Sequence, residues 1–454
     1  MAPQPLRRAL IAESGSLIVL ALPLVAGLAS ATMLGTIDTV MLGPLGSVPL
    51  AAVSVVASIL MMLYAGLYGF VGPVGILVGQ AYGAEDPSEV GSILRHGLFL
   101  GLVGGLLGSL AMAAGLLALP FLEQPDDVVA IITPYWLWMA ASLVPFTLSL
   151  VYKGMLDAVD RAWTGTALLL VPLAVNAFLN WVLIYGHLGA PALGLTGAGV
   201  ASFIGQCAGL FAMALVVHRA PSLARYRDQK PLSVIAFFRQ AREGAPMATQ
   251  YLLEGGSAAI GGLMIGLFGA VALAANQIAS SVTSILYMLP LGMSAAVSIR
   301  IAQAAGAGAP ERLGAIGYAG IGLVTVWTTA FTGLLIAFGE ASAGMIVSDP
   351  VLIAAAATFF VVFALMQVID GIQSVALGAL RGILDNDWPT IVSLIAYWLI
   401  ALPVAWLVAF RFGFGAPGVW AGFGAGLAVA AVALVWRFER KTRPLRSDSA
   451  DGAS

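Results

Sequence analysis

Three carboxylates lie inside long apolar stretches of the sequence, where a charge is expensive. Glu254 belongs to ATQYLLEGGSAAI, within a run from Ala245 to Phe268 that holds no other charge. Asp38 and Asp370 lie inside two further apolar runs. A charged side chain near the centre of a bilayer costs at least ~2.5 kcal/mol on insertion scales, and such residues tend to be functional. The chemistry to consider first is therefore that of carboxylates inside a membrane.

A carboxylate in this setting can take up a proton, because burial disfavours the charged form, or it can hold a cation. We expect no lysine or arginine at comparable depth, so an internal salt bridge is not expected to offset the cost. Both remaining options suit an exporter of cations that is driven by protons or sodium. The alternative for each acid is a neutral, hydrogen-bonded core residue, and Asp38, near the outer end of its run, is the weakest candidate by depth.

Uncharged polar groups accompany the acids. Asn176 and Asn180 are four residues apart, so on a helix both face the same side. An amide oxygen can bind sodium or pair with a protonated carboxyl. The alternative is an ordinary hydrogen bond between helices. Other residues near the acids are candidates for lining a cleft or a drug cavity, although most are expected to be packing: Gln250, Tyr251, Asn276, Gln277, Tyr287, Met288, Met366, Gln367 and Gln373.

The composition is that of a polytopic membrane protein. Of 454 residues, 60% are hydrophobic and 9% are charged, whereas soluble domains contain about 25% charged residues. The net charge of −2 and the lack of a basic patch argue against nucleic acid as a partner. The single cysteine, Cys207, excludes an internal disulfide and a cysteine-based metal cluster, and the three histidines show no metal-ligand spacing.

Twelve apolar runs have the length of about 20 residues that a membrane-spanning helix needs. Backbone groups in lipid must be satisfied within the segment, so the runs predict helices. The predicted fold class is an all-α integral membrane protein with twelve transmembrane helices. The length of the first run favours a retained helix over a signal peptide. The approximate runs are 16–40, 50–78, 95–119, 130–152, 164–186, 196–217, 245–268, 272–299, 314–338, 351–378, 390–410 and 416–436.

The distribution of lysine and arginine predicts the orientation of the chain. With the N-terminus in the cytoplasm, all of the 20 basic residues except Arg411 fall on the cytoplasmic side, as the positive-inside rule requires. Both termini are then cytoplasmic. The basic connections are 80–95, 153–163, 218–242, 300–313 and 379–388.

The two halves of the sequence are related by a shift of 223 residues, the separation of Pro23 and Pro246. With that shift, Tyr64 falls on Tyr287, and GQAYGA falls on AQAAGA. Two six-helix repeats with the same orientation predict pseudo-symmetric lobes around an axis along the membrane normal. Pro23 and Pro246 are hinge candidates because proline removes a helical hydrogen bond. The predicted parts are an N-lobe (1–217), a cytoplasmic linker (218–242), a C-lobe (243–437) and a cytoplasmic tail (438–454).

The stretches IDTVMLGPLGSVPLAA, GQAYGA and AANQI … LPLGMSAA resemble the multidrug and toxic compound extrusion (MATE) exporters, particularly the NorM-type bacterial branch. The resemblance covers essentially the whole chain. It implies an antiporter in the bacterial inner membrane that exports cationic or amphiphilic drugs in exchange for sodium or protons. It implies no cofactor, no enzymatic activity and no obligate protein partner, with membrane lipid as the surroundings.

The resemblance also assigns site residues. Some relatives carry an aspartate where this chain has Asn180, and some carry a tyrosine where it has Met366, one turn before the tenth-helix aspartate. A tyrosine ligand at that position is therefore in doubt. The matched positions are Asp38 on the first helix, Asn176 and Asn180 on the fifth, Ala198 and Ser202 on the sixth, Glu254 on the seventh and Asp370 on the tenth. If sodium is the coupling ion, its site is expected at Glu254 and Asp370, or at Asp38, Asn176 and Asn180.

Three other functions fit the sequence less well than export. A flippase for lipid-linked or polysaccharide precursors needs cationic residues to hold a pyrophosphate, whereas the three intramembrane charges are acids. An intramembrane enzyme would need a catalytic cluster, for which only a Glu254–Asp370 dyad is available. A nucleotide-driven pump is disfavoured because the sequence has no GxxxxGK[ST] motif. The sequence thus predicts a secondary exporter that works by rocking of two lobes, with the choice between sodium and protons open.

Overall fold

The computed structural model describes residues 4–122, 125–227, 231 and 233–451, and all regular structure within them is helical. The predicted fold class is confirmed. The longer helices have the following bounds: α1 (Gln4–Leu42), α2 (Ser47–Gly83), α3 (Pro87–Gly115), α4 (Asp126–Ala158), α5 (Ala162–Leu168), α6 (Leu170–Tyr185), α7 (Leu195–Arg219), α8 (Val234–Gly266), α9 (Ala270–Gly306), α10 (Pro310–Gly344), α11 (Pro350–Gly382), α12 (Asp387–Ser393), α13 (Leu402–Trp406) and α14 (Gly415–Asp451).

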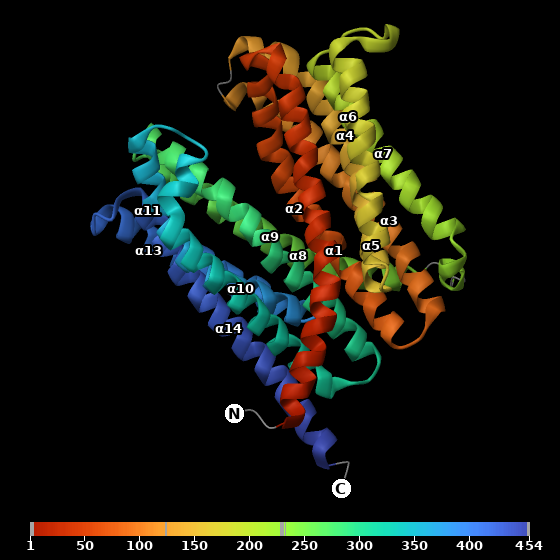
Figure 1. Ribbon diagram of the computed structural model, residues 1–454. Helices are drawn as coiled ribbons and strands as arrows, with labels where there is room; N and C mark the ends of the chain where they lie inside the picture. The colour runs from red at the N-terminus through yellow and green to blue at the C-terminus, as the bar shows by residue number, and fades with distance from the viewer. Residues whose placement is uncertain (1–3, 123–124, 228–230, 232, 452–454) are drawn as a thin grey trace. The chain divides into compact units, whose positions relative to one another are not determined.

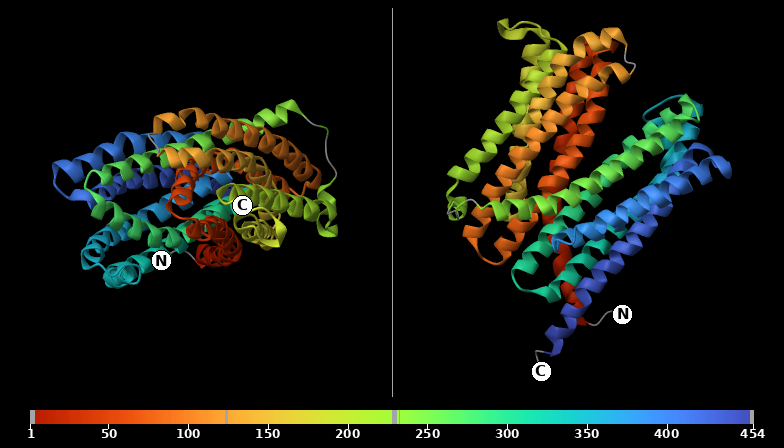
Figure 2. Two further views of the ribbon diagram at one scale, coloured as in Figure 1. Left: turned by 90° about the horizontal axis from the view of Figure 1, so that it is seen from above. Right: turned by 180° about the vertical axis from the view of Figure 1, so that it is seen from behind.

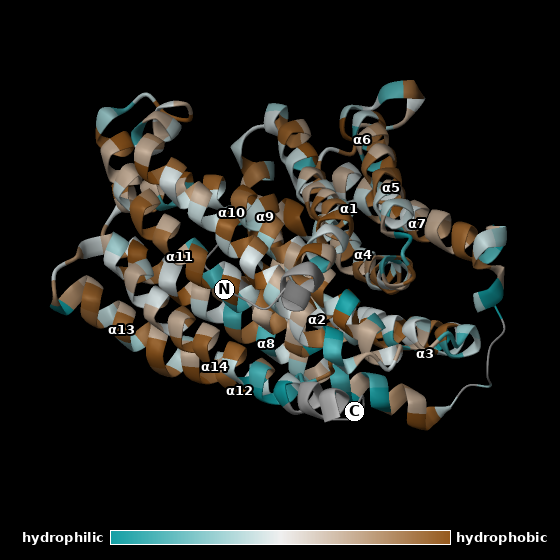
Figure 3. Ribbon diagram, turned by 60° about the horizontal axis from the view of Figure 1, so that its bottom comes forward, coloured by the Kyte–Doolittle hydropathy of each residue, from teal (hydrophilic) through white to brown (hydrophobic). Residues whose placement is uncertain are grey.

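Each of the twelve predicted runs corresponds to one helix or to a broken helix. Within the described residues, eleven segments are long and apolar enough to cross a membrane. The remaining run is α8, whose mean hydropathy is lowered by Gln250, Tyr251 and Glu254. The fifth run divides into α5 and α6, and the eleventh contains π-helical turns on either side of α13. Figure 3 shows hydrophobic residues predominating along α13 and most of α14.

The chain forms two compact units, and it changes from one to the other inside helices. One unit comprises residues 1–25 and 249–454, and the other comprises residues 26–248. The changes occur within α1 and within α8, each two residues after the equivalent prolines Pro23 and Pro246. The predicted lobe boundaries lie in connections instead. Each unit therefore contains the beginning of one of these helices and the remainder of the other.

A central helix organises the packing in each unit. In the unit of residues 26–248, α4 packs against α2, α3 and α7. In the other unit, the equivalent helix of the repeat, α11, packs against α9, α10 and α14. Within each unit the helices run side by side along much of their length (Figures 1 and 2). The sequence repeat is thus a repeat of the packing plan.

Two equivalent glycines contact the beginnings of α1 and α8, the helix segments that pack in the unit of the other repeat. A Cβ on Gly69 of α2 would lie 2.8 Å from backbone atoms of Met247 and Ala248 in α8. A Cβ on Gly292 of α9 would lie 3.2 Å from the backbone nitrogen of Val25 in α1 and would also clash with its side chain. Gly292 lies 223 residues after Gly69, so the same close contact is built twice. The absence of a side chain at both positions allows the helices to cross closely.

We expect Gly69→Val to destabilise the fold, because the added side chain would overlap the α8 backbone just before the chain changes units. Overpacking of this kind costs about 1–3 kcal/mol. The measurement is the melting temperature of the purified protein in detergent. Gly262→Val is the matched control, because a Cβ at Gly262 of α8 meets no atom within 4 Å. Equal melting temperatures for the two variants would contradict the close contact.

Candidate functional site

A buried polar cluster surrounds Asp38 in the unit of residues 26–248. Asn180 donates a 2.6 Å hydrogen bond to Oδ1 of Asp38, and Asn176 donates one of 3.1 Å to the same oxygen. The hydroxyl of Ser202 donates to Oδ2 at 3.1 Å. Three helices supply the groups, α1, α6 and α7, and no side chain of the four is more than 5% exposed. The structure therefore brings four of the predicted site residues together.

Neutral donors surround the Asp38 carboxylate. In the described part of the chain, no basic side chain forms an ion pair with it. Oδ1 of Asn180 is also buried, and it has no hydrogen-bond partner among the described residues. A carboxylate and an unused amide oxygen in one buried cluster form an acceptor-rich site. Such a site can take up a proton or a cation with oxygen ligands.

Ala198 contributes no polar group to this cluster. It lies on α7 one turn before Ser202, so the two share a helix face. Its side chain is fully buried in a hydrophobic cluster that contains Trp136. Two tyrosines that the sequence did not connect with Asp38, Tyr64 and Tyr135, lie close enough to interact with it electrostatically. Ala198 thus lies on the helix face of Ser202 without contributing a hydrogen bond, and two tyrosines interact with Asp38.

The second cluster lies in the unit that contains Glu254 and Asp370. Tyr287 of α9 donates a 3.1 Å hydrogen bond to Oδ1 of Asp370 on α11. Its hydroxyl is also 2.6 Å from that of Ser374, one helical turn beyond Asp370, and Ser374 then donates to Tyr287. Glu254 of α8 interacts electrostatically with Asp370. Both acids are half-buried. Two carboxylates and two hydroxyls from three helices therefore share one neighbourhood.

The tyrosine of this cluster comes from an unexpected helix. A tyrosine one turn before Asp370 is replaced by Met366, which packs against a hydrophobic cluster. Tyr287 supplies a hydroxyl to Asp370 from α9 instead. The repeat contained a signal for this residue, because Tyr287 is equivalent to Tyr64, which neighbours Asp38 in the other unit. An equivalent tyrosine near each acid was therefore recognisable from the repeat.

One basic residue of a predicted connection, Arg381, lies in the last turn of a helix. The predicted connection 379–388 contains this residue, but α11 continues to Gly382 and buries Arg381, which is 9% exposed. Its guanidinium donates to the hydroxyl of Tyr251 at 2.9 Å and to Oε1 of Gln250 at 3.1 Å. It also interacts electrostatically with Glu254. A buried cation at the end of α11 is consequently within electrostatic reach of Glu254.

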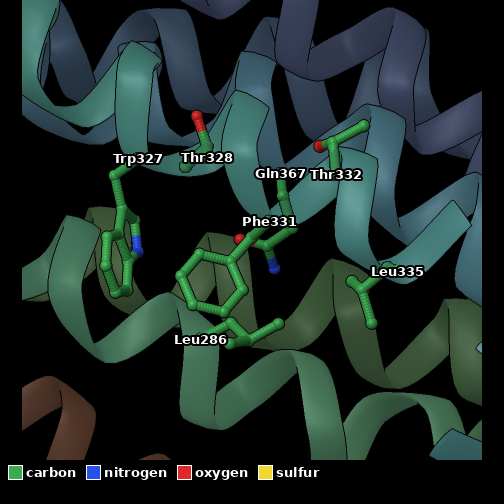
Figure 4. Close-up of a pocket in the computed structure, with 7 residues that line it drawn as sticks. All are labelled: Leu286, Trp327, Thr328, Phe331, Thr332, Leu335 and Gln367. Carbon is green, nitrogen blue, oxygen red and sulfur yellow. The ribbon is translucent and has the colours of Figure 1, made fainter. Parts of the chain in front are cut away.

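A small cavity adjoins the second cluster. Figure 4 shows Trp327 and Phe331 of α10 around it, together with Gln367, which lies one turn before Asp370 on α11. The indole nitrogen of Trp327 is buried and has no hydrogen-bond partner among the described residues. The cavity measures about 10 Å³, which is about the space that one water molecule needs. It is too small for a drug.

Comparison with known protein families gives one match that covers most of the chain. The family model described as MatE matches residues 23–182 and residues 246–407. The two matches begin at Pro23 and Pro246, the positions after which the chain changes units. Each match therefore corresponds to one copy of the internal repeat.

Relatives of known sequence and structure extend over nearly the whole chain. A protein of Synechococcus described as "Probable multidrug resistance protein NorM" is 31% identical over 446 residues, 96% of each chain. A protein of Rhizobium meliloti with the same description is 32% identical and covers 96% of this chain and 95% of its own. A crystal structure described as "MATE in the bent conformation" has a TM-score of 0.88 at 18% identity and covers 99% of this chain and 100% of its own.

We expect a double-mutant cycle to show that Tyr287 and Ser374 act as a pair. Tyr287→Phe leaves the Ser374 hydroxyl without this partner, and Ser374→Ala leaves the Tyr287 hydroxyl without Ser374. Each change should lower the free energy of unfolding by about 1–3 kcal/mol. The double variant removes both hydroxyls and should be more stable than the sum of the single effects predicts. Melting temperatures of the purified variants measure this. Simple additivity would show that the 2.6 Å contact does not couple the two residues.

Proposed function

The chain belongs to the MATE family of multidrug transporters, in its NorM-type bacterial branch, and we propose that it exports cationic or amphiphilic drugs in exchange for sodium ions or protons. It is a many-span membrane transporter and not an enzyme. The observation that carries the proposal is the pair of intramembrane acid clusters, one in each unit. The proposed location is the inner membrane, with both termini in the cytoplasm.

Each cluster has the chemistry of a cation or proton site. Asp38 has amide and hydroxyl oxygens beside it, and the Glu254–Asp370 pair has the hydroxyls of Tyr287 and Ser374. Oxygen ligands of this kind suit a hard cation such as sodium. One cluster would bind the coupling ion, and drug would compete with the ion for the same charge. Exchange requires that ion and drug favour different conformations of the transporter.

Alternating access is proposed to use Pro23 and Pro246 as hinges. Each proline lies two residues before the point where its helix changes units. A proline inside a helix leaves one backbone carbonyl without its usual partner and permits a bend. Motion of one repeat against the other can then be absorbed in α1 and α8. This placement supports the hinge role more strongly than the sequence pattern alone.

A flippase for anionic lipid precursors is the weaker alternative. The acids of the two clusters, Asp38, Glu254 and Asp370, would repel a pyrophosphate. Among the described residues, the buried cation within electrostatic reach of Glu254 is Arg381, and its guanidinium already donates to Gln250 and Tyr251. The charge of the clusters therefore favours a cationic substrate.

The function is tested by ethidium efflux from proteoliposomes with imposed gradients. If an inward sodium gradient at fixed pH drives efflux, and Glu254→Gln or Asp370→Asn abolishes it, the second cluster binds the coupling ion. If only a proton gradient works and both variants still export, the coupling site is Asp38. Glu340→Gln is the matched control, because Glu340 is an exposed acid of α10. Failure of every gradient with every cation tested would overturn the exporter proposal.

We expect Pro246→Ala to slow efflux several-fold without changing drug affinity. The substitution restores a backbone hydrogen bond and stiffens α8 where the chain changes units. Transport rates and equilibrium drug binding are measured on the same preparation. Pro134→Ala is the control, because Pro134 is an exposed proline of α4 within a single unit. A variant that binds less drug and transports at the normal maximal rate would contradict the hinge role.

A further inference from the structure

A short motif near the C-terminal end of the central helix occurs in both halves of the chain, shifted by five residues relative to the 223-residue repeat. It reads KGMLD at residues 153–157 and RGILD at residues 381–385. In the first copy the basic residue has a local partner, because Lys153 forms a 2.6 Å ion pair with Asp157. Lys153 and Asp157 are four residues apart and both are largely buried. The motif therefore provides its own counter-ion in the first half.

The second copy has lost that internal pairing. Asp385 instead binds Arg437 at 2.8 Å and lies 3.8 Å from Lys441. Arg381 donates to two neutral oxygens, and its Nε has no hydrogen-bond partner among the described residues. No carboxylate in the described chain forms an ion pair with it. A buried cation without a carboxylate partner is destabilising, so the placement calls for a reason beyond packing.

The acid that interacts with the charge of Arg381 is Glu254. Gln250 and Tyr251 lie four and three residues before Glu254 on α8, so the three side chains share one helix face. Glu254 is therefore about 6 Å along the helix from Gln250, which accepts a hydrogen bond from the guanidinium of Arg381. In the first half, the position equivalent to Glu254 is Ala31. Only the second half therefore has both an acid at this position and a basic residue, Arg381, that is not paired with the aspartate of its own motif.

We propose that Arg381 is a fixed counter-charge that Gln250 and Tyr251 hold one helical turn from Glu254, where it weakens the binding of the transported cation to the Glu254–Asp370 cluster. The inference rests on the proposed cation exchange at this cluster. Arg381 is a positioning residue, since it acts on the cation through Glu254. Two carboxylates that bind a cation too tightly would not release it, and a nearby positive charge keeps binding reversible.

The test compares variants that move the cation affinity in opposite directions. Arg381→Gln removes the competing charge and should lower the cation dissociation constant about tenfold, which corresponds to about 1.4 kcal/mol. Gln250→Ala releases the guanidinium toward Glu254 and should raise the constant. Arg381→Lys keeps the charge and should stay near wild type. Lys441→Gln is the control, because its side chain is 48% exposed and lies near Asp385.

Affinity is measured as equilibrium binding of radioactive sodium and of tetraphenylphosphonium to the purified full-length protein. A merely structural role would weaken binding in both Arg381→Gln and Gln250→Ala, and that result would overturn the proposal. If Arg381→Gln lowers the dissociation constant just as much in a protein that also carries Glu254→Gln, the proposal is overturned as well. Binding is measured without transport, so a failure of efflux in proteoliposomes bears on the exporter function alone. If Arg381→Gln does not fold, Gln250→Ala is compared with Arg381→Lys instead. Gln250→Ala should raise the dissociation constant while Arg381→Lys stays near wild type, and no loss of affinity in Gln250→Ala contradicts the proposal.

Discussion

The interior of a membrane offers no water to a polar group, and the rest of this structure follows from that constraint. Backbone groups are satisfied within helices. Two of the acids that remain inside, Asp38 and Asp370, accept hydrogen bonds from side chains of other helices. Asp38 receives two amides and a hydroxyl, and Asp370 receives the hydroxyl of Tyr287. Each of these two acids thus links its helix to a neighbouring helix, so groups that can bind a cation also hold the helices of a unit together.

Duplication of the chain has produced two clusters with different chemistry on one packing plan. The tyrosine position is shared, as Tyr64 and Tyr287. The first cluster has one acid among amides and is buried, whereas the second has two acids, hydroxyls and an arginine nearby and is half-buried. The proposed exchange would gain from this difference, because two sites with equal preferences could not distinguish an ion from a drug.

The sequence predicted the helices well and the clusters partly. Asp38 with Asn176 and Asn180 was predictable because two asparagines four residues apart share a face and the family pattern joins them to the aspartate. Arg381 was missed because helix ends are poorly defined by hydropathy, and four more residues of α11 changed its place from a connection to a buried site. The position at which α1 and α8 change units was also hidden, because it depends on contacts between helices far apart in the sequence, such as that of Gly69 with Ala248.

The exchange of helix halves has a consequence for how such a chain can arise and fold. Each unit contains the beginning of a helix that belongs, in sequence, to the other repeat. Two separate copies of a six-helix ancestor with this arrangement would form a domain-swapped dimer, in which neither copy completes its fold alone. Joining them in one polypeptide makes the exchange independent of concentration. It also means that residues 10–25 become fully packed only after the second half has been synthesised.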